Sequence, residues 1–195
     1  LLDVLSGITA PTGGSFRVGT SEITTQQPSD PAQLRSLGVA HVPEDRHKCG
    51  IILPFSAAES MVLGYSSGDG QNGGWWLSPS ELETNCAERM QDFDIRPPLP
   101  KLASANFSGG NQQKIVLARE ISTQPKLLLV GQPTRGVDIG AIEFIHKQLI
   151  ALRNKGCAIL LVSVELDEIM SLSDRILVMN NGQMVGELAR DEADE

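Results

Sequence analysis

The sequence predicts an α/β fold with a mostly parallel sheet core, an antiparallel edge and an inserted helical subdomain. Apolar runs alternate with helical patterns in the second half of the chain, which is typical of parallel strand-helix-strand units. Short runs with alternating polar and apolar residues, near the start and in a later hairpin, predict antiparallel pairs. A glycine-rich break followed by a capped helix predicts the insertion. The 195 residues suffice for one core and a small subdomain.

Residues 1–50 carry the signals of several short elements. Gly7 ends a helical run, and Asp30 with Pro31 gives an N-cap and a first helical residue. The expected elements are, in order, a helix end at 1–7, strands at 15–18 and 22–24, a helix at 30–37 and a buried strand at 39–42.

Residues 51–124 form the expected helical subdomain. Residues 51–65 are apolar and helix-like, and residues 66–74 are expected to be a flexible loop. Ser78-Pro79-Ser80-Glu81 predicts a capping box that starts a helix ending near Phe93. Leu82, Ala87 and Met90 are available for packing in that helix. Trp75 and Trp76 are compatible with a contact surface and with core filling.

The last part of the chain predicts a parallel unit followed by a hairpin. Leu127 to Val130 and Ala158 to Val162 are apolar enough for buried parallel strands. Asn180-Asn181-Gly182 predicts a tight turn. The other elements expected from residue 110 onward are helices at 110–123, 141–154 and 167–172, and hairpin strands at 176–179 and 184–188.

Composition narrows the classes of function. The net charge of −8 and the absence of a basic cluster argue against a nucleic-acid partner. Cys49, Cys86 and Cys157 lack paired spacing, which favours reduced thiols and disfavours zinc. The sequence has no signal peptide and no apolar run near the roughly 18 residues that span a bilayer. We therefore expect any link to a membrane to run through a partner.

Ser108-Gly109-Gly110 is the segment most suited to bind a ligand. A serine and two glycines that open a helix leave backbone N–H groups unpaired at the positive end of the helix dipole, which suits a phosphate. Taken alone, the three residues would equally suit an ordinary helix cap.

Four segments, in this order, resemble the ATP-binding subunits of ABC transporters. The resemblance is greatest to the second nucleotide-binding half of bacterial importers for simple sugars and nucleosides, and it covers nearly the whole chain. It implies an ABC nucleotide-binding domain with a P-loop NTPase-like fold. The four segments are Val42 to His47, Phe107 to Lys114 (here called the signature segment), Gln132 to Asp138, and Ser173 to Met179.

The resemblance assigns roles to several residues. Ser108, Gly109, Gly110 and the following Asn111 belong to a signature that holds the γ-phosphate of an ATP bound by a facing domain. Glu44 stands where other ABC domains have a glutamine that reaches magnesium and the membrane subunit, although a solvated turn is the default interpretation of this run.

Two further segments contain candidate contact residues. Arg46 and His47 are candidates for contacts with the helical subdomain or a permease loop. Asp138 lies in a loop that crosses to the opposite ATP site in the family, and it is also a natural N-cap.

His41 and His146 are interpreted as packing or surface residues, because neither has a second ligand at metal spacing.

The sequence departs from the family where the family has its acids. Gly131 replaces the aspartate that orders magnesium, and Gln132 stands at the position of the catalytic glutamate. Glycine supplies no ligand, and glutamine cannot accept a proton as a carboxylate would. Hydrolysis at this domain's own site is therefore expected to be nearly abolished. A sequence error or an engineered change would leave the same pattern. Val164 occupies the place of a histidine that many ABC ATPases have, but importer halves of the resembled type commonly lack it.

No G-x-x-x-x-G-K-[ST] pattern occurs in the sequence. A helix end at residues 1–7 and an acidic run at residues 189–195 add to the expectation that the chain is a fragment. In family terms, residues 1–50 would be a partial ATPase core, 51–124 the helical subdomain with the signature segment, and 125–195 the C-terminal part of the core.

The leading hypothesis is an ATP-binding component of a sugar or nucleoside importer, inactive as an ATPase on its own. ATP and magnesium are the cofactors implied for the complete parent protein. The expected partners are the first nucleotide-binding domain or a second copy, and transmembrane permease subunits at the cytoplasmic face of the membrane. The alternatives are a non-catalytic regulatory or partner-binding domain, a soluble ABC ATPase acting on ribosomes or DNA, and a non-functional remnant.

Overall fold

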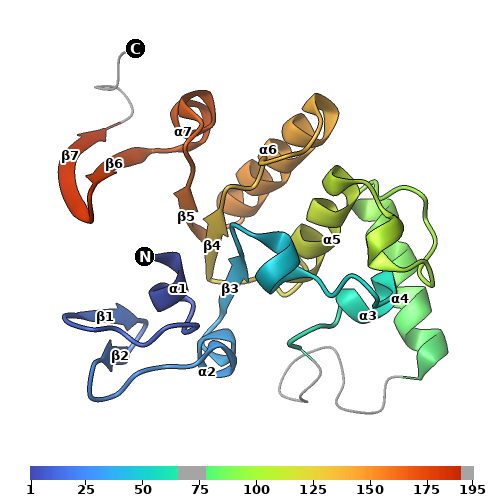
Figure 1. Ribbon diagram of the computed structural model, residues 1–195, viewed down its shortest axis with the longest axis horizontal. Helices are drawn as coiled ribbons and strands as arrows, with labels where there is room; N and C mark the ends of the chain where they lie inside the picture. The colour runs from blue at the N-terminus through green and yellow to red at the C-terminus, as the bar shows by residue number, and fades with distance from the viewer. Residues whose placement is uncertain (66–77, 190–195) are drawn as a thin grey trace.

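Three parallel strands form the centre of the fold (Figure 1). The computed structural model describes residues 1–65 and 78–189, and in it β3 (Val39–Val42), β4 (Leu127–Gly131) and β5 (Ala158–Val162) pair in that order. The middle strand, β4, is almost wholly buried, whereas β5 is only half-buried. The expectation that residues 158–162 are buried is wrong, because other elements of the described part of the chain cover the side chains of β5 only in part.

Two antiparallel hairpins accompany the sheet, which confirms the expected combination of parallel and antiparallel strands. β1 (Ser15–Val18) pairs with β2 (Ser21–Thr24), and β6 (Arg175–Asn180) pairs with β7 (Gln183–Ala189). Each hairpin is a separate two-stranded sheet. Asn181 and Gly182 have φ values of 49° and 76°, as the central residues of a type I′ turn require.

Short helices lie before and after the sheet in the chain, and the ends of the two that precede it agree with the sequence. α1 (Leu2–Leu5) ends before Gly7, whose φ of 78° is the left-handed conformation that favours glycine. α2 (Pro31–Ser36) begins after Asp30, whose carboxylate accepts a hydrogen bond from the backbone N–H of Gln33 at 2.8 Å. α7 (Leu166–Leu172) follows β5.

The region between β3 and β4 is mainly helical. Its elements are, in order, η1 (Arg46–Gly50), α3 (Ala57–Ser60), α4 (Pro79–Asp92), η2 (Ser104–Asn106) and α5 (Gly109–Ile121). Within residues 51–65 only α3 is an α-helix, so the expected longer helix is wrong. The reason is local: Pro54 lacks a backbone donor, and Ser56 starts a new helix through a capping box with Glu59.

The capping box of Ser78 and Glu81 is confirmed at the start of α4. Met90 is buried as expected, but Ala87 is exposed and Cys86 faces the core in its place. The expected loop at residues 66–74, together with Trp75 and Trp76, lies outside the described residues.

Hydrophobic side chains pack on both faces of the sheet. Leu128 and Val130 of β4 join a large cluster with α4, α5 and α6 (Ile139–Asn154), whereas Leu129 faces a smaller cluster with α1 and α2. This alternation follows from the two-residue period of a strand. The larger cluster joins residues from all three of the expected divisions of the chain, whose boundaries remain a prediction.

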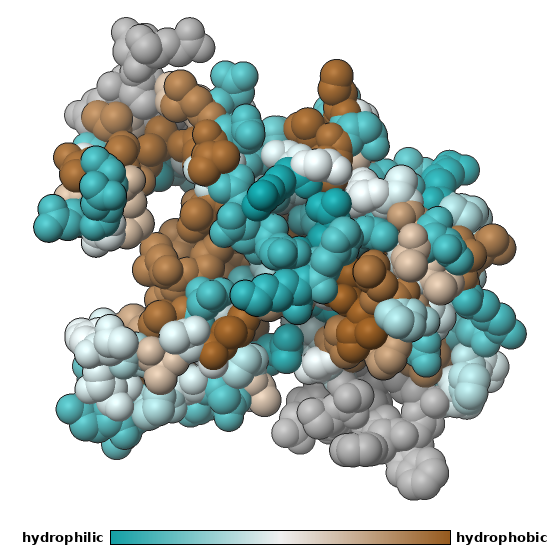
Figure 2. Space-filling view, viewed as in Figure 1, coloured by the Kyte–Doolittle hydropathy of each residue, from teal (hydrophilic) through white to brown (hydrophobic). Residues whose placement is uncertain are grey.

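The face drawn in Figure 2 is hollowed between the β1–β2 hairpin and the β6–β7 hairpin, and apolar side chains gather in the hollow. Several apolar residues of the second hairpin are exposed, among them Met179, Met184 and Val185. Within the described residues, no helix combines the length and the apolar character needed to cross a bilayer.

Candidate functional site

The signature segment opens α5, the most deeply buried helix of the described structure. Ser108 is the N-cap, with φ −61° and ψ 158°, and its hydroxyl accepts a hydrogen bond from the backbone N–H of Asn111 at 3.4 Å. Gly109 and Gly110 are the first two helical residues, whose N–H groups have no carbonyl partner within the helix. Gln112 to Glu120 are all buried and hold the helix in place. An exposed hydroxyl and two backbone donors therefore stand on a fixed support.

Close neighbours explain why the signature segment needs both glycines. A Cβ on Gly109 would lie 2.9 Å from Nη2 of Arg46 and 3.0 Å from the carbonyl oxygen of Gly136. A Cβ on Gly110 would lie 3.0 Å from Oδ2 of Asp138 and 3.2 Å from Cβ of Ala141. The glycines thus let the start of α6 and the guanidinium of Arg46 approach the start of α5.

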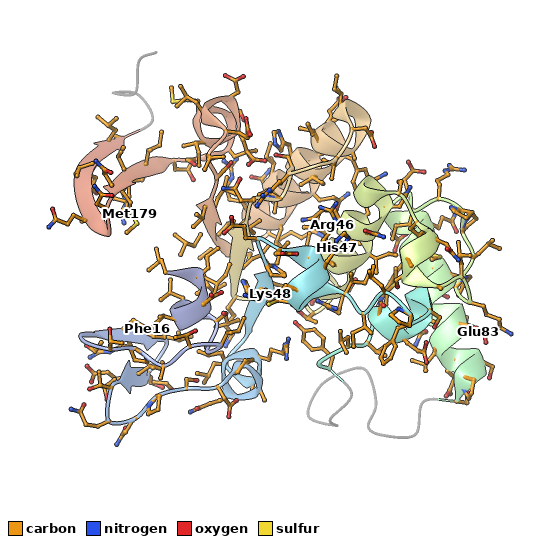
Figure 3. All side chains as sticks on the ribbon, viewed as in Figure 1. Phe16, Arg46, His47, Lys48, Glu83 and Met179 are labelled. Carbon is orange, nitrogen blue, oxygen red and sulfur yellow. The ribbon has the colours of Figure 1, made fainter. Side chains whose placement is uncertain are left out.

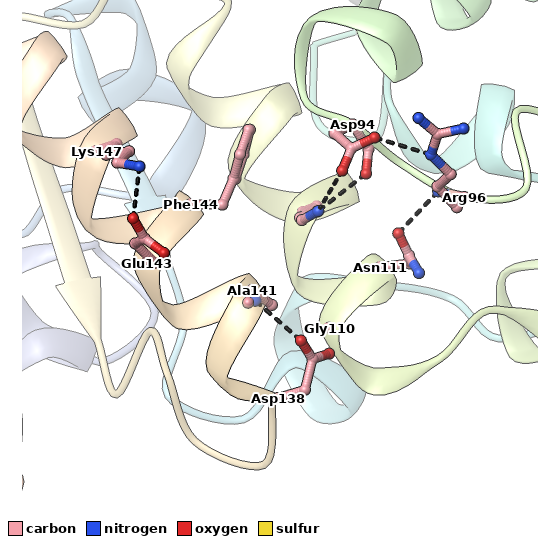
Figure 4. A pocket seen from close by; sticks show the side chains of 11 residues that line it. Asp94, Arg96, Gly110, Asn111, Asp138, Ala141, Glu143, Phe144 and Lys147 are labelled. Carbon is pink, nitrogen blue, oxygen red and sulfur yellow. Dashed lines mark hydrogen bonds and ion pairs between the residues drawn. The ribbon is translucent and has the colours of Figure 1, made fainter.

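Asp138 has the N-cap role that its position suggested. Its Oδ1 accepts a hydrogen bond from the backbone N–H of Ala141 at 2.9 Å, and the residue is exposed (Figure 4). Its second carboxylate oxygen faces Gly110 of the same chain. The structure therefore brings Asp138 together with the signature segment. The contact expected with an opposite ATP site stays a prediction.

Gly131 and Gln132, where the resemblance leads us to expect acids, lie at the end of β4. Gly131 is the last residue of the strand, and Gln132 follows with a φ of 46°, a conformation that few residues other than glycine adopt. The backbone N–H of Gln132 donates to the carbonyl of Val162 at 2.8 Å, which keeps the turn against β5. The side-chain oxygen of Gln132 is 3.5 Å from the backbone nitrogen of Val164.

The surroundings of Gly131 do not fit a magnesium ion. A Cβ there would lie 2.8 Å from Cδ1 of Leu2 and 2.9 Å from the backbone nitrogen of Glu44, so an aspartate would require both to move. Magnesium prefers oxygen ligands, but the side chain nearest to this point is that of a leucine. Among residues 1–65 and 78–189 there is also no cluster of three potential metal ligands.

The segment after β3 links the signature segment to the loop after β4 (Figure 3). Arg46 Nη1 donates to the carbonyl of Arg135 at 3.0 Å, and burial lowers the pKa of Arg46. His47 Nε2 is 2.8 Å from Oε1 of Gln112 in the signature segment. The expected contact of Arg46 and His47 with the helical region is therefore present. Glu44 is exposed and pairs with Arg135 at 3.5 Å.

A buried polar network between α5 and β3 was not foreseen from the sequence. Glu120 is fully buried: its Oε1 pairs with Nε of Arg119 at 2.8 Å, and its Oε2 accepts hydrogen bonds from the Tyr65 hydroxyl and the His41 backbone N–H. Arg119 also donates to the carbonyls of Gly50 and Ser60. No linear pattern reveals these partners, because they come from separate elements.

The histidines behave as packing residues in the described structure. His146 pairs with Glu168 at 3.0 Å, and the buried Nε2 of His41 has no hydrogen-bond partner. Burial lowers the pKa of His41, so its ring is held neutral inside the fold.

Comparisons with known proteins agree with the resemblance. A family model described as "ABC transporter" matches residues 1–135. The chain is 41% identical over 186 residues to the nucleoside import ATP-binding protein NupA of Lactococcus lactis, covering 95% of this chain and 36% of that protein. It is 36% identical over 195 residues to the guanosine import ATP-binding protein NupO of Bacillus subtilis, covering 100% and 38%. It is 38% identical over 200 residues to the arabinose import ATP-binding protein AraG of Pseudomonas syringae, covering 100% and 38%.

Solved structures share the fold at low sequence identity. A dimeric ATP-binding cassette in a post-hydrolysis state, bound to ADP and Pi, superimposes with a TM-score of 0.76 at 18% identity, over 97% of this chain and 78% of that chain. A nucleotide-free cassette from an ABC transporter gives 0.74 at 22% identity, over 96% and 74%.

The chain thus has the fold of an ATP-binding cassette, as expected from its sequence, and it spans from 36% to 38% of the length of the three curated relatives compared. The family model covers more than half of the chain, so the protein belongs to the ABC transporter family, as an ATP-binding domain.

Proposed function

We propose that this chain is part of the ATP-binding component of an importer for simple sugars or nucleosides. In this role it presents Ser108, Gly109 and Gly110 to an ATP held by a facing nucleotide-binding domain. One observation carries the proposal: an exposed serine and two unpaired helix N–H groups stand on a rigidly buried helix. Relatives whose names describe import of nucleosides, guanosine and arabinose support the substrate class.

The second part of the proposal is that the domain's own site does not hydrolyse ATP. Gly131 offers no magnesium ligand and is closely approached by Leu2 and the backbone of Glu44. Gln132 cannot serve as a carboxylate base, and its side chain faces the backbone of Val164. The lack of acidic side chains at Gly131 and Gln132 and the contact with Leu2 both support a site that does not hydrolyse ATP. Hydrolysis would then take place at the ATP site of the facing domain.

Coupling to a permease would use the surface after β3. Glu44, Asp45 and His47 are exposed there, and the nearby Leu53 and Phe55 are 37% and 38% exposed. Charged side chains beside exposed apolar ones suit a protein partner. The proposed location is the cytoplasmic face of the membrane, where the permease subunits hold the domain.

A chimaera tests this function. In it, this chain replaces the 186 matched residues of the Lactococcus lactis relative, whose remaining residues would supply the facing domain. We expect magnesium-dependent ATP hydrolysis by the chimaera and none by this chain alone. Ser108→Arg should reduce turnover by about a hundredfold or more, because the arginine side chain would occupy the space beside α5 that the terminal phosphate of ATP needs. Asn106→Arg adds the same side chain to an exposed position two residues earlier and should leave turnover nearly unchanged.

Other results would contradict the proposal. An inactive chimaera, or equal turnover with and without Ser108→Arg, would show that the signature segment has no part in hydrolysis. Turnover by the isolated chain would refute the inactive own site. Retention of the chain on a polyanion at physiological salt would favour a ribosome or DNA partner instead.

A further inference from the structure

Asn111 bonds to the loop of the helical region that contains Arg96 (Figure 4), and it also bonds to the signature serine. The backbone N–H of Arg96 donates to Oδ1 of Asn111 at 2.8 Å, and Nδ2 of Asn111 donates to Oγ of Ser108 at 2.9 Å. The first bond fixes the orientation of the amide, because a backbone N–H can only donate and must meet the oxygen. The nitrogen of the amide therefore has to face Ser108.

This arrangement determines which way the Ser108 hydroxyl can act. A serine hydroxyl donates one hydrogen and accepts through two lone pairs. Oγ of Ser108 accepts twice from Asn111, once from Nδ2 and once from the backbone nitrogen. Within the described residues no acceptor is found for the hydroxyl hydrogen, and Ser108 is exposed. The hydroxyl hydrogen of Ser108 is therefore free to donate to a group outside the described residues.

The loop that orients Asn111 is itself anchored. Nε of Arg96 pairs with Oδ1 of Asp94 at 2.9 Å, and Nζ of Lys114 donates to the Asp94 carbonyl at 2.9 Å. Lys114 is 8% exposed and lies 4.6 Å from the centre of the Phe144 ring on α6. These residues line a cavity of about 440 Å³ beside the start of α5. Lys114 and Asn111 both belong to α5. The bond from Lys114 to Asp94 therefore holds the loop that contains Arg96 in position beside the Asn111 amide.

We infer that Asn111 is a positioning residue that obliges Ser108 to donate its hydroxyl hydrogen to an anion at the signature segment. The inference rests on the proposed function, in which that anion is the terminal phosphate of ATP. A phosphate oxygen only accepts hydrogen bonds, so a serine that spent its hydrogen inside the protein would contribute nothing. Asn111 prevents this by filling the accepting side of Oγ.

Asn111→Asp is the decisive change. The new carboxylate still accepts from Arg96, but it cannot donate to Ser108 and takes the hydroxyl hydrogen for itself. In the chimaera described above, we expect the dissociation constant of a fluorescent ATP analogue to rise, and kcat/KM to fall, by about tenfold to a hundredfold. The thermal midpoint should stay near that of the parent. Asn106→Asp introduces the same charge near Ser108 but leaves the hydrogen bonds of Asn111 intact. It should change the dissociation constant and kcat/KM by less than about threefold each.

A double-mutant cycle with Ser108→Ala separates the possible failures. If Asn111 acts through the serine, the double variant should be no weaker than Ser108→Ala alone. If Ser108→Ala itself has no effect, the proposed function is wrong, and so is the role of Asn111 in orienting Ser108. If Ser108→Ala weakens binding while Asn111→Asp does not, or if the two losses add, only the role of Asn111 is refuted.

Discussion

At the scale of single residues, Gly131 and Gln132 are constrained by their surroundings as well as by the chemistry that they lack. The neighbours of Gly131 approach so closely that a Cβ there would lie under 3.0 Å from Leu2 and from the Glu44 backbone. Gln132 keeps a left-handed backbone that glutamine does not favour. The sequence predicted the loss of chemistry at both positions. It could not predict the approach of Leu2 and Glu44, because neither residue is near Gly131 in the chain.

Two glycine substitutions test this packing. Gly131→Ala should lower the free energy of unfolding by about 1–3 kcal/mol, because its Cβ would meet Leu2 and the Glu44 backbone at under 3.0 Å. Gly140→Ala is the matched control: its nearest neighbour would be 3.4 Å away, and alanine in a helix is favoured by about 0.5–1 kcal/mol. Urea denaturation of the parent and of both variants measures the two changes in the free energy of unfolding. Equal effects would mean that the space at Gly131 is not restricted.

His41 predicts a pH dependence of stability. Burial lowers its pKa, partly opposed by Glu120, so the unfolded chain binds a proton at a higher pH than the folded one. The stability contributed by the neutral ring is complete above the unfolded pKa of about 6.5 and is lost as the pH falls through it. Between pH 7 and pH 5, the parent should lose up to about 1.4 kcal/mol per pH unit more than His41→Leu. Urea midpoints at the two pH values measure this, and parallel curves would disprove it.

At the scale of elements, α5 is the support on which the site depends. The sequence predicted its position to within two residues, because Ser108 and the glycines mark its start clearly. It did not predict that every residue from Gln112 to Glu120 is buried, since several of them are polar or charged. Gln112, Arg119 and Glu120 find partners in β3, η1, α3 and η2, which only the fold brings together.

The buried pair of Arg119 and Glu120 should therefore be costly to break. Glu120→Gln removes the charge that compensates a buried guanidinium, and we expect a loss of about 3–5 kcal/mol in the free energy of unfolding. Lys147→Ala breaks an exposed pair with Glu143 and should cost about 0.5 kcal/mol or less. Chemical denaturation compares the two, and a small effect of Glu120→Gln would mean that the network is not important for stability.

At the scale of the whole molecule, most of the architecture followed from the sequence. The parallel unit of β4 and β5, both hairpins and the capped helices came from local patterns, whereas the place of β3 beside β4 appears only in the structure. The partial exposure of β5 could not be predicted. An apolar run predicts a buried strand whether or not other elements cover its side chains. The relation between Asn111, Arg96 and Ser108 was also invisible, since the loop at Arg96 is 15 residues away in the chain.

We propose a division of labour, in which this domain completes the facing ATP site and does not turn over ATP at its own. Vanadate trapping with a photoreactive ATP analogue tests it most directly, in the chimaera with a protease site between the two halves. We expect the trapped nucleotide to label only the half that faces the signature segment, and Ser108→Arg to abolish the label. Label trapped on the half that contains Gly131 and Gln132 would contradict this division of labour.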